Sequence, residues 1–462
     1  MDQQTLDVDL DLISRLDRNG PRYTSYPTAD RFSESFDRRK YTTWAARRTV
    51  TGLSRPLSIY VHLPFCRSLC YYCACNKVIT RDGNKAAKYL RYLTREIALQ
   101  ATLFRDDTRV TQMHWGGGSP TFYGIVELTE LYATLRSHFE FAPDGEYSIE
   151  IDPRTVEPAT MAALRSLGFN RVSFGVQDFD PDVQRAINRV QSESQTTAVI
   201  DAARNAGFAS VSVDLIYGLP RQTVSTFEET LDRVAKLRPD RIAVYNYAHL
   251  PGRFKAQKQI AAAEIPAAET KLRLLRLAAE QLVAAGYVYI GMDHFALPND
   301  SLAVAQRQGR LHRNFQGYST HAECDLIGLG VSAIGAIGPT YTQNARTLSD
   351  YYRHLDDNEL PIVRGIELSR DDLVRRSVIQ ALMCHFELSK DAIDIAYLLD
   401  FDSYFATELK ELRQLAHAGL VTFDGSWIVV TPKGRMLIRS ICMVFDKYLR
   451  HDRDSRRYSR TI

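Results

Sequence analysis

The segment HLPFCRSLCYYCACN, residues 62–76, holds four of the seven cysteines of this 462-residue chain, at the spacing C-x3-C-x2-C-x-C. Thiolates this close together in one loop can surround a single centre, so the segment predicts a soft metal or an iron–sulfur cluster rather than a disulfide framework. A structural zinc site with four cysteine ligands is the alternative, but such sites usually pair two C-x2-C hooks across an intervening segment. The single hook therefore favours a cluster.

The first three cysteines, Cys66, Cys70 and Cys73, have a spacing that resembles the signature of the radical S-adenosylmethionine (SAM) superfamily. The resemblance implies that three thiolates hold three irons of a [4Fe-4S] cluster. The fourth iron stays open for the amino and carboxylate groups of SAM, as a catalytic metal site leaves a position for its substrate. Cys75 is the odd member, because a fourth ligand would close the site and suit electron transfer. The spacing alone leaves that alternative open.

Length and composition indicate a soluble globular protein of two or three domains, with 45% apolar and 24% charged residues. A net charge of +3 implies no nucleic-acid partner. The acidic start MDQQTLDVDLDL lacks a hydrophobic region, so we expect no signal peptide. The least polar stretch, residues 326–338, is short and broken by glycines, so it should not span a membrane. Clustered free cysteines without an export signal indicate a cytoplasmic protein.

From residue 57 onward, strand-like and helix-like runs alternate. The strand-like runs are 57–64, 110–118, 147–152, 171–177, 210–218 and 241–247, and helix-like stretches such as 85–104, 158–169 and 226–237 lie between them. This α/β alternation predicts a parallel sheet with right-handed crossovers. The pattern does not decide whether the sheet closes; the superfamily resemblance implies a partial (β/α)6 TIM-like barrel.

Unusual residues gather where these strands end, which is where such folds place their chemistry. The cysteine loop follows the first strand and Gly116–Gly118 ends the second. The later ends carry Glu150, Asp152, Gln177, Asp214, Tyr217, Asn246 and Tyr247. All six sets would surround one mouth, which we predict to be the active site.

Single residues of this mouth allow two interpretations. The glycine triplet removes side chains, so backbone groups can approach a bound amino acid, or it is a plain turn. Tyr60 and His62 stand two apart on one strand and share a face, and His62 could equally be a core histidine. Gln177, Arg189 and Asp214 could hold a polar ligand, although Arg189 alone is typical of a charge on a surface helix.

Four regions are expected. Residues 1–50 form an N-terminal arm with GPRYTSYPT at 20–28, and 51–300 form the barrel, whose edge the run 287–298 could extend. We expect 301–368 to be a connecting segment lining the mouth and 369–462 to be a mostly helical domain. The helices 370–384 and 405–420 and the hairpin 421–434 make this domain resemble a winged helix, and the basic run RRYSR (456–460) hints at DNA binding. Interleaved acidic residues argue against that, so a lid or packing role is favoured.

Motifs along most of the chain resemble the family of oxygen-independent coproporphyrinogen III oxidases, also called dehydrogenases. They are PRYTSYPT, YVHLPFC with its further cysteines, HWGGGSPT, SIEIDPR, FGVQDF, NRVQ, VDLIYGLPRQT, YNYAHLP, GMDHFA, HRNFQGY and GVSAIG. The resemblance runs from about residue 20 to the C-terminus. The sequence departs from the family pattern at Ala74, where relatives often have glycine, and at THAECD (320–325).

The resemblance implies an oxygen-independent step of heme biosynthesis. A 5′-deoxyadenosyl radical made from SAM at the cluster takes a hydrogen from the β-carbon of a propionate. Loss of carbon dioxide and one electron then leaves a vinyl group. Two such events convert coproporphyrinogen III to protoporphyrinogen IX in a monomeric protein, with an electron donor and an acceptor that the sequence does not identify. The alternative is a heme chaperone or heme-modifying relative; chaperones of this superfamily lack both a cysteine at position 75 and the arm.

The resemblance also implies roles for individual residues. Two SAM molecules would bind, the first on the cluster against Tyr60, Gly117 and Glu150. The second would be lined by Tyr72, Cys75, Gly118, Ser119, Gln177, Arg189, Asp214, Ala248 and Ile334. Tyr60, His62 and Cys75 would take part in catalysis, which gives Cys75 a role other than holding iron.

Overall fold

The computed structural model describes residues 6–16, 18–48, 55–104 and 109–451. Residues 1–5 of the acidic start and the basic run 456–460 lie outside the described residues. Among the helices that are described, none is long and apolar enough to cross a membrane.

Six parallel strands form the centre of the main sheet, adjacent to one another in chain order. They are β1 (Leu57–Leu63), β4 (Arg109–Gly117), β5 (Glu140–Ile151), β6 (Arg171–Gln177), β7 (Ser210–Tyr217) and β8 (Arg241–Asn246). Every side chain of β1 except Tyr60 is buried, because parallel strands are covered on both faces. The predicted six-stranded partial barrel is confirmed.

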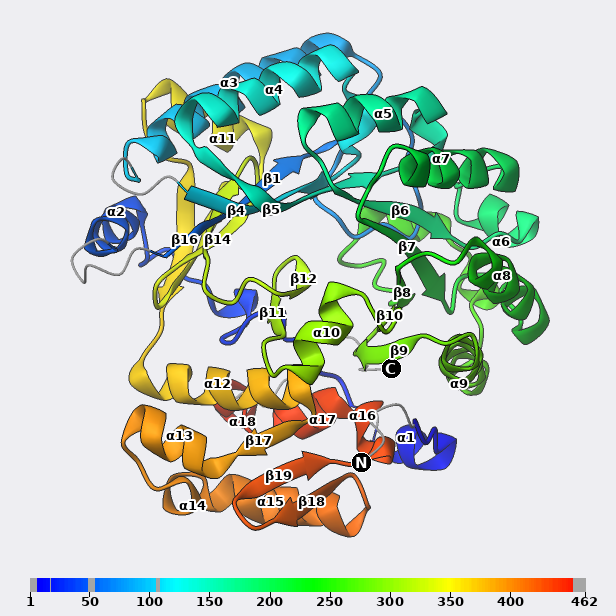
Figure 1. Cartoon of the computed structure of the whole chain (residues 1–462), viewed down its shortest axis with the longest axis vertical. Helices are drawn as coiled ribbons and strands as arrows, with labels where there is room; N and C mark the ends of the chain where they lie inside the picture. Colours follow the sequence, from blue (N-terminus) through cyan, green and yellow to red (C-terminus); the bar gives the residue numbers. More distant parts are fainter. Residues whose placement is uncertain (1–5, 17, 49–54, 105–108, 452–462) are drawn as a thin grey trace.

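Helices cover the outer face of this sheet, as Figure 1 shows. They are α3 (Gly83–Ala101), α4 (Ile125–His138), α5 (Pro158–Leu167), α6 (Pro181–Ala186), α7 (Glu193–Asn205), α8 (Val224–Leu237) and α9 (Ala268–Ala284). These helices connect the end of one strand to the start of the next, with α6 and α7 both between β6 and β7, so the loops at the carboxyl ends of the strands meet at one end of the barrel.

The sheet continues past β1 on one side, which the sequence did not predict. β13 (Asp325–Leu329) pairs parallel to β1, and β14 (Ile334–Ile337), β15 (Thr340–Asn344) and β16 (Ile362–Glu367) follow antiparallel. The second half of 301–368, expected to be a connecting segment, therefore belongs to the main sheet. A Cβ on Gly328 would lie 2.6 Å from the carbonyl oxygen of Ile334, so this glycine allows close approach to another strand rather than to a ligand.

On the other side, the expected edge strand at 287–298 is a hairpin. β10 (His294–Ala296) pairs antiparallel with β8, and β9 (Val288–Gly291) forms the outer edge. Met292, with a φ of 55°, lies in the turn that splits the run into two strands. The short elements near this edge are α10 (Ser301–Arg307), β11 (His312–Asn314) and β12 (Gly317–Ser319), whereas α11 (Leu348–Asp356) packs against α3.

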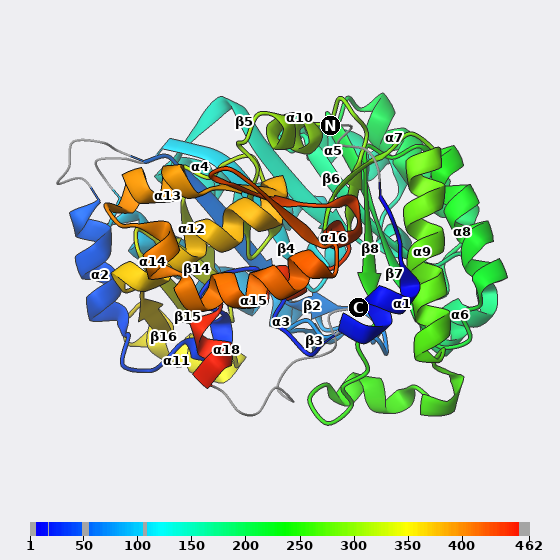
Figure 2. The same ribbon diagram turned by 90° about the horizontal axis from the view of Figure 1, so that it is seen from below.

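The C-terminal region lies below the sheet in Figure 1 and is seen from below in Figure 2. Its helices surround a three-stranded sheet of order β17-β19-β18 with a tight turn at Gly425, as in the predicted hairpin. The elements are α12 (Arg370–His385), β17 (Glu387–Ser389), α13 (Lys390–Tyr397), α14 (Phe401–Tyr404), α15 (Ala406–His417), β18 (Val421–Asp424), β19 (Trp427–Val430), α16 (Pro432–Arg435), α17 (Ile438–Met443) and α18 (Lys447–His451).

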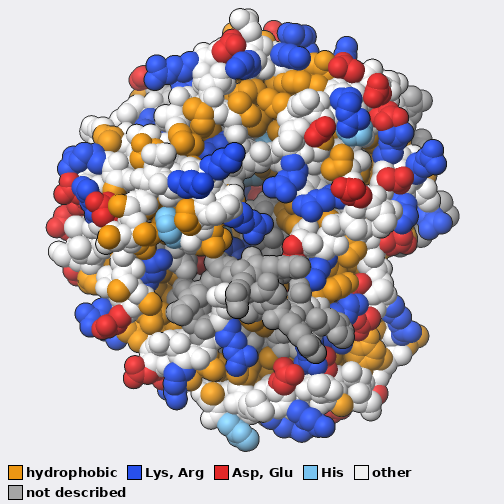
Figure 3. Space-filling view, turned by 180° about the vertical axis from the view of Figure 1, so that it is seen from behind, with side chains coloured by type: hydrophobic (Ala, Val, Ile, Leu, Met, Phe, Trp, Pro, Cys, Tyr) orange, Lys and Arg blue, Asp and Glu red, His pale blue; other side chains and the backbone are white. Residues whose placement is uncertain are grey.

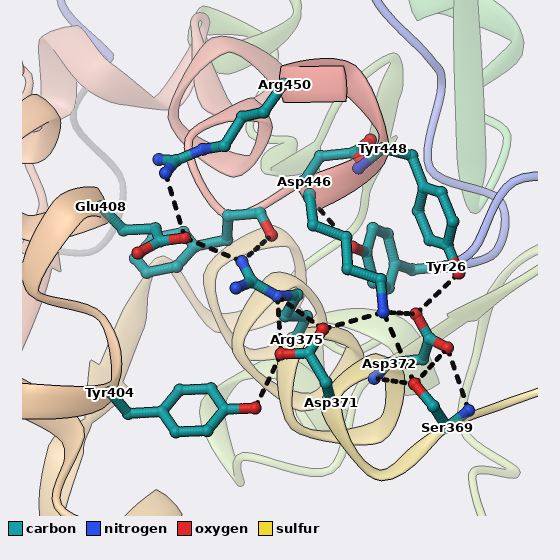
Figure 4. A network of polar contacts seen from close by, with 12 residues as sticks. Tyr26, Ser369, Asp371, Asp372, Arg375, Tyr404, Glu408, Asp446, Tyr448 and Arg450 are labelled. Atoms are coloured by element: carbon teal, nitrogen blue, oxygen red, sulfur yellow. Dashed lines mark hydrogen bonds and ion pairs between the residues drawn. The ribbon is translucent and has the colours of Figure 1, made fainter. Parts of the chain in front are cut away.

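The N-terminal arm joins this region to the barrel. It contains α1 (Leu10–Leu16), which lies against α9 (Figure 2), and α2 (Arg38–Arg47). Tyr23 donates a hydrogen bond to Asp446 at 3.0 Å, and the hydroxyl of Tyr26 accepts one from the backbone of Lys447. Figure 4 shows the polar network around Tyr26, Asp371 and Asp372. The Lys447 ammonium lies 2.8 Å from Asp371 and 2.7 Å from Asp372. Tyr23 and Tyr26 of the arm are thus buried against the C-terminal region.

Candidate active site

The cysteine loop leaves the carboxyl end of β1 and is held at both ends. The short strands β2 (Phe65–Cys66) and β3 (Val78–Ile79) pair with each other and close the loop. The backbone N–H of Tyr71 donates to the carbonyl of Ile187, and Lys77 donates to the carbonyl of Cys73 at 2.8 Å. These bonds fix the loop against the segment after β6, so its thiols lie in the wall of the barrel mouth.

A cavity of about 450 Å³ opens at this mouth, among the carboxyl ends of the strands. Thirteen of the residues predicted from the sequence line it: Cys66, Cys70, Tyr72, Cys73, Cys75, Gly117, Gly118, Ser119, Glu150, Asp152, Gln177, Arg189 and Asp214. Residues from β4, β5, β6, β7 and the loops between them therefore face one space with the cysteines. This is the arrangement that the strand-end pattern predicts.

The three cysteines of the C-x3-C-x2-C motif are close neighbours. Burial, and then the nearby thiols Cys73 and Cys70, raise the pKa of Cys66 to about 12. The thiols of the motif are thus near enough to influence one another, and thiolates are the usual ligands of a multi-iron cluster.

His62 lies in the wall behind the cysteine loop and is fixed by two hydrogen bonds. Its Nε2 is 2.9 Å from the carbonyl of Asn76 and must carry the proton, so its Nδ1, 3.0 Å away from the hydroxyl of Tyr60, accepts from that hydroxyl. Burial lowers the pKa of His62, which favours the neutral ring. Tyr60 and His62 therefore lie on the same face of β1, as predicted. Through its bond to Asn76, His62 holds the end of the cysteine loop.

Glu150 brings a negative charge to the cavity. Its carboxylate is 3.1 Å from Nε2 of His114 and accepts a hydrogen bond from the backbone N–H of Gly117 at 3.2 Å. Burial raises the pKa of Glu150, but the bonds from His114 and Gly117 outweigh it, so this pKa lies below its ordinary value. The side chain is 45% exposed and faces open space, so an ionised carboxylate is available to a cationic ligand.

The glycine triplet is required by close packing within the protein. A Cβ on Gly116 would lie 2.8 Å from the Glu150 carboxyl, and one on Gly117 would lie 2.6 Å from the His62 ring. A Cβ on Gly118 would lie 2.6 Å from the backbone of Pro64. The triplet therefore lets β4 approach both the cysteine loop and the acidic end of β5.

Arg189 is buried in the cavity wall, so the surface-charge interpretation is wrong. Its side chain is 6% exposed, and NH1 lies 3.1 Å from Asp152 and 3.5 Å from the sulfur of Cys70. Its NH2 donates to the carbonyl of Gly175. Its Nε is buried without a partner. A fixed positive charge therefore lies beside the cysteine loop.

Asp214 lies on β7 and faces Glu150 across the cavity. Burial, and then the charge of Glu150, raise the pKa of Asp214 to about 7, although Ser173 donates a hydrogen bond to it at 3.1 Å. The residue therefore changes its charge near neutral pH.

Several predicted residues do not line this cavity: Tyr60, His62, Gly116, Tyr217, Asn246, Tyr247, Ala248 and Ile334. Ala248 lines an adjoining cavity of about 840 Å³ that Tyr72, Cys73 and Cys75 share with the arm. Ile334 lines neither cavity and packs near Phe32.

The sequence interpretation gave no role to His114, Arg154 and Tyr245, which also belong to the site. His114 and Tyr245 lie at alternating strand positions that point to the same side as the predicted strand-end residues, and this alternation could have identified them. Arg154 lies in the segment after a strand, where no such alternation applies.

A cysteine loop after the first strand of a parallel partial barrel, open to a cavity with an ionised carboxylate, is the arrangement of a radical SAM protein. Residues 60–234 match the Radical SAM superfamily, and residues 368–437 match the HemN C-terminal domain. The chain is 51% identical over 460 residues to the oxygen-independent coproporphyrinogen III oxidase of Pseudomonas aeruginosa, covering 99% of each chain. It is 50% identical to that of Escherichia coli, covering all of each chain.

The solved structure of coproporphyrinogen III oxidase (HemN) from Escherichia coli, described as a radical SAM enzyme, superposes with a TM-score of 0.92 at 50% identity. The match covers 96% of this chain and 100% of that one. This chain belongs to the family of oxygen-independent coproporphyrinogen III oxidases.

Proposed function

We propose that this protein converts coproporphyrinogen III to protoporphyrinogen IX without oxygen, by oxidative decarboxylation of two propionate side chains to vinyl groups. One observation carries the proposal: the three cysteines of the motif and Glu150 line one cavity, in a chain that matches such oxidases over its whole length. The hydrogen on the β-carbon of a propionate is not acidic enough for an ordinary base, so the reaction needs a radical.

Cys66, Cys70 and Cys73 hold a [4Fe-4S] cluster in this proposal. The cluster, when bound, supplies the electron that splits SAM into methionine and the 5′-deoxyadenosyl radical, which takes the propionate hydrogen. The donor set suits it, because thiolates are the usual ligands of such clusters. One electron must enter through a donor and another must leave to an acceptor after carbon dioxide is lost.

The first SAM is held by Glu150, Gly117 and Tyr60 in this proposal. The ionised Glu150 carboxylate offers an acceptor for an ammonium or for ribose hydroxyls, and it is fixed by bonds from His114 and Gly117. Tyr60 stacks on His114 with ring centroids 5.9 Å apart, and its hydroxyl bonds to His62. These contacts fix the position of the Glu150 carboxylate relative to the cysteine loop.

The second SAM is placed beside the first. The residues proposed to contact it are Tyr72, Cys75, Gly118, Ser119, Gln177, Arg189, Asp214 and Ala248. Ile334 lines neither cavity and is left out of this set. Support comes from the two adjoining cavities, since Tyr72 and Cys75 line both of them. Cys75 is exposed where the cavities meet, which suits a residue that touches SAM or substrate rather than iron. Arg189 and Asp214 supply opposite charges for a zwitterionic ligand.

The substrate carries four propionates, and basic residues line the way to the site. Arg67, Lys77 and Arg154 line the inner cavity, and Arg22 and Arg253 line the outer one. Figure 3 shows Lys and Arg side chains gathered around a hollow on the back of the molecule. Such side chains attract a polyanion and pair with its carboxylates.

A heme chaperone of the same superfamily is the alternative function. Cys75 and the buried arm favour the oxidase, because the arm forms one wall of the outer cavity and places Arg22 there. We further propose a monomeric, cytoplasmic protein, supported by the family resemblance and by free cysteines.

The test is anaerobic turnover. Protein with its cluster restored is incubated with SAM, a reductant, coproporphyrinogen III and an electron acceptor, and the porphyrins are separated afterwards. We expect a product with two vinyl groups.

The Cys75→Ser variant should keep the visible absorption of the cluster and lose turnover, whereas Cys66→Ser should lose the cluster. SAM cleavage without any vinyl product would contradict the proposal, and loss of the absorption in Cys75→Ser would make Cys75 a ligand.

A further inference from the structure

The stretch THAECD, at which the sequence departs from the family pattern, brings together three side chains that can bind a metal. His321, Glu323 and Cys324 offer an imidazole nitrogen, a carboxylate oxygen and a thiol sulfur that all lie within 4.8 Å of one another. They lie in the loop between β12 and β13. The cavities at the barrel mouth do not include them, so they play no part in the reaction proposed above.

Two of the three distances among these atoms are close to those of a tetrahedral zinc site, and the third is within 4.8 Å. Nδ1 of His321 lies 3.3 Å from Oε1 of Glu323, and the sulfur of Cys324 lies 3.7 Å from that same oxygen. Tetrahedral zinc with bonds of about 2.0 Å to nitrogen and oxygen and about 2.3 Å to sulfur places these pairs about 3.3 and about 3.5 Å apart. An ion could therefore enter with little movement of the side chains.

The loop around these ligands is already fixed in shape. The backbone N–H of His321 donates to the hydroxyl of Ser319 at 3.1 Å, and Gln112 of β4 donates to the same hydroxyl at 3.0 Å. At the other end Asp325 forms a buried ion pair with Arg48, with its carboxylate 2.6 Å from Nε. Little chain entropy would therefore be lost when a metal binds.

The surroundings also suit a metal. The hydroxyl of Thr111 lies 3.2 Å from the sulfur of Cys324, where it can donate to a thiolate and hold it in place. Glu323 is 53% exposed and His321 is 19% exposed, so solvent reaches the site and leaves the fourth position to water. Thiolate, imidazole and carboxylate together are typical ligands of zinc.

We propose that His321, Glu323 and Cys324 form a zinc site within the loop between β12 and β13. On binding, the Cys324 thiol loses its proton to solvent and its sulfur bonds to the ion. β13 begins at Asp325, beside Leu57 at the start of β1, whereas the cysteine loop follows the end of β1. The zinc site and the cysteine loop therefore lie at opposite ends of the sheet.

The test uses protein that carries its iron–sulfur cluster, so that zinc cannot occupy the cysteine loop. The protein is dialysed under anaerobic conditions against zinc buffered by a competing chelator, and iron and zinc are then measured per chain. We expect one zinc per chain with iron unchanged. Cys324→Ser and Glu323→Gln should each weaken zinc binding at least tenfold while keeping iron and SAM cleavage.

The matched control is His354→Gln. His354 lies 3.7 Å from Glu359 in a comparable histidine–glutamate pair, but no cysteine forms a close three-ligand group with it among the described residues, so this variant should bind zinc like the parent. Cobalt serves as a second probe, because a cobalt–thiolate absorption difference should appear in the parent and vanish in Cys324→Ser. No zinc beyond trace in the parent, or equal zinc in the parent and both site variants, would overturn the proposal.

Discussion

Gly117 takes a φ of +114° directly beside the His62 ring, and this one position ties β4 to the wall of the cysteine loop. The ring in turn is fixed between Tyr60 and Asn76. A side chain at Gly117 would have to displace that ring, and it would also strain a backbone conformation that L residues rarely adopt.

We therefore predict that Gly117→Ala lowers the free energy of unfolding by about 1–3 kcal/mol, measured by denaturant unfolding, and reduces the iron retained. Gly83→Ala is the matched control, because nothing lies within 4 Å of a Cβ at Gly83, at the start of α3. It should change stability by less than about 0.5 kcal/mol. Equal effects of the two substitutions would show that the contact with His62 is unimportant.

Asp214 should make stability depend on pH. Its pKa is raised from 3.8 to about 7, first by burial and then by Glu150, so ionisation costs the folded state more than the unfolded chain. Stability is therefore lost as pH rises between these two values. Asp214→Asn cannot ionise, and we expect it to unfold at a higher temperature than the parent at about pH 8.

The gain should be on the order of 2 kcal/mol, since each pKa unit is about 1.4 kcal/mol and the side chain faces a water-accessible cavity. It should shrink as pH falls towards about 5. Thermal unfolding midpoints at several pH values provide the measurement. A constant difference between variant and parent across this range would exclude the raised pKa of Asp214.

Sequence patterns predicted which residues face the mouth of the barrel. They were less able to predict the hydrogen bonds and ion pairs that fix each of these side chains. Strand-end positions placed Glu150, Gln177 and Asp214 in one cavity. The environment of Arg189 could not be predicted, because its burial depends on Asp152 and Cys70, which are distant in sequence. Local pattern also could not distinguish a glycine triplet that contacts a ligand from one that contacts His62 and Pro64.

Among the elements, α18 is held to the start of α12 by the ion pairs of Lys447, whose backbone N–H also donates to the hydroxyl of Tyr26 in the arm. Its ammonium lies 2.8 Å from Asp371 and 2.7 Å from Asp372, and the Asp372 side chain is 4% exposed. Burial raises the pKa of Asp372, but Lys447 and Ser369 outweigh it, so this pKa lies below 3.8. The ion pair therefore stabilises the fold above that pH, and its contribution is lost as pH falls through the lowered value.

Lys447→Met should lower the free energy of unfolding by about 3 kcal/mol at neutral pH, because it leaves a buried carboxylate unpaired. Hydrogen exchange should also quicken at the start of α12 and around Tyr26. Lys433→Met is the control, since its ammonium lies 3.8 Å from Asp7 and 3.7 Å from Asp9 in an exposed group. We expect less than about 1 kcal/mol there. Matching losses in the two variants would contradict the role of the buried pair.

Elements with local signals were the ones the sequence could predict. The six barrel strands follow helices at regular intervals, and the hairpin β18–β19 has an Asp-Gly turn. The pairing of β13 with β1 joins segments about 270 residues apart in sequence, and no local pattern carries that information. The division of 287–298 into two strands was also not predicted; it depends on the turn at Met292.

At the scale of the whole molecule, one hydrophobic core runs through all regions. A single cluster of buried residues extends from Leu12 in the arm through the barrel to Phe445 in the C-terminal region. Regions that share a core lose their packing together.

We therefore predict one cooperative unfolding transition for cluster-loaded protein. Near-ultraviolet circular dichroism, tryptophan fluorescence and the visible absorption of the cluster should change at the same denaturant concentration. Early loss of the C-terminal region, seen as a separate first transition by hydrogen exchange, would contradict a shared core.

The proposed chemistry requires that one iron of the cluster has no protein ligand. The most direct measurement is electron paramagnetic resonance of the reduced, anaerobically reconstituted protein with and without SAM, in the parent and in Cys75→Ser. We predict a [4Fe-4S] signal that shifts when SAM is added, in both proteins. A signal that does not change when SAM is added would contradict the proposed function. Zinc in place of iron in the loop of Cys66, Cys70 and Cys73 would contradict it as well.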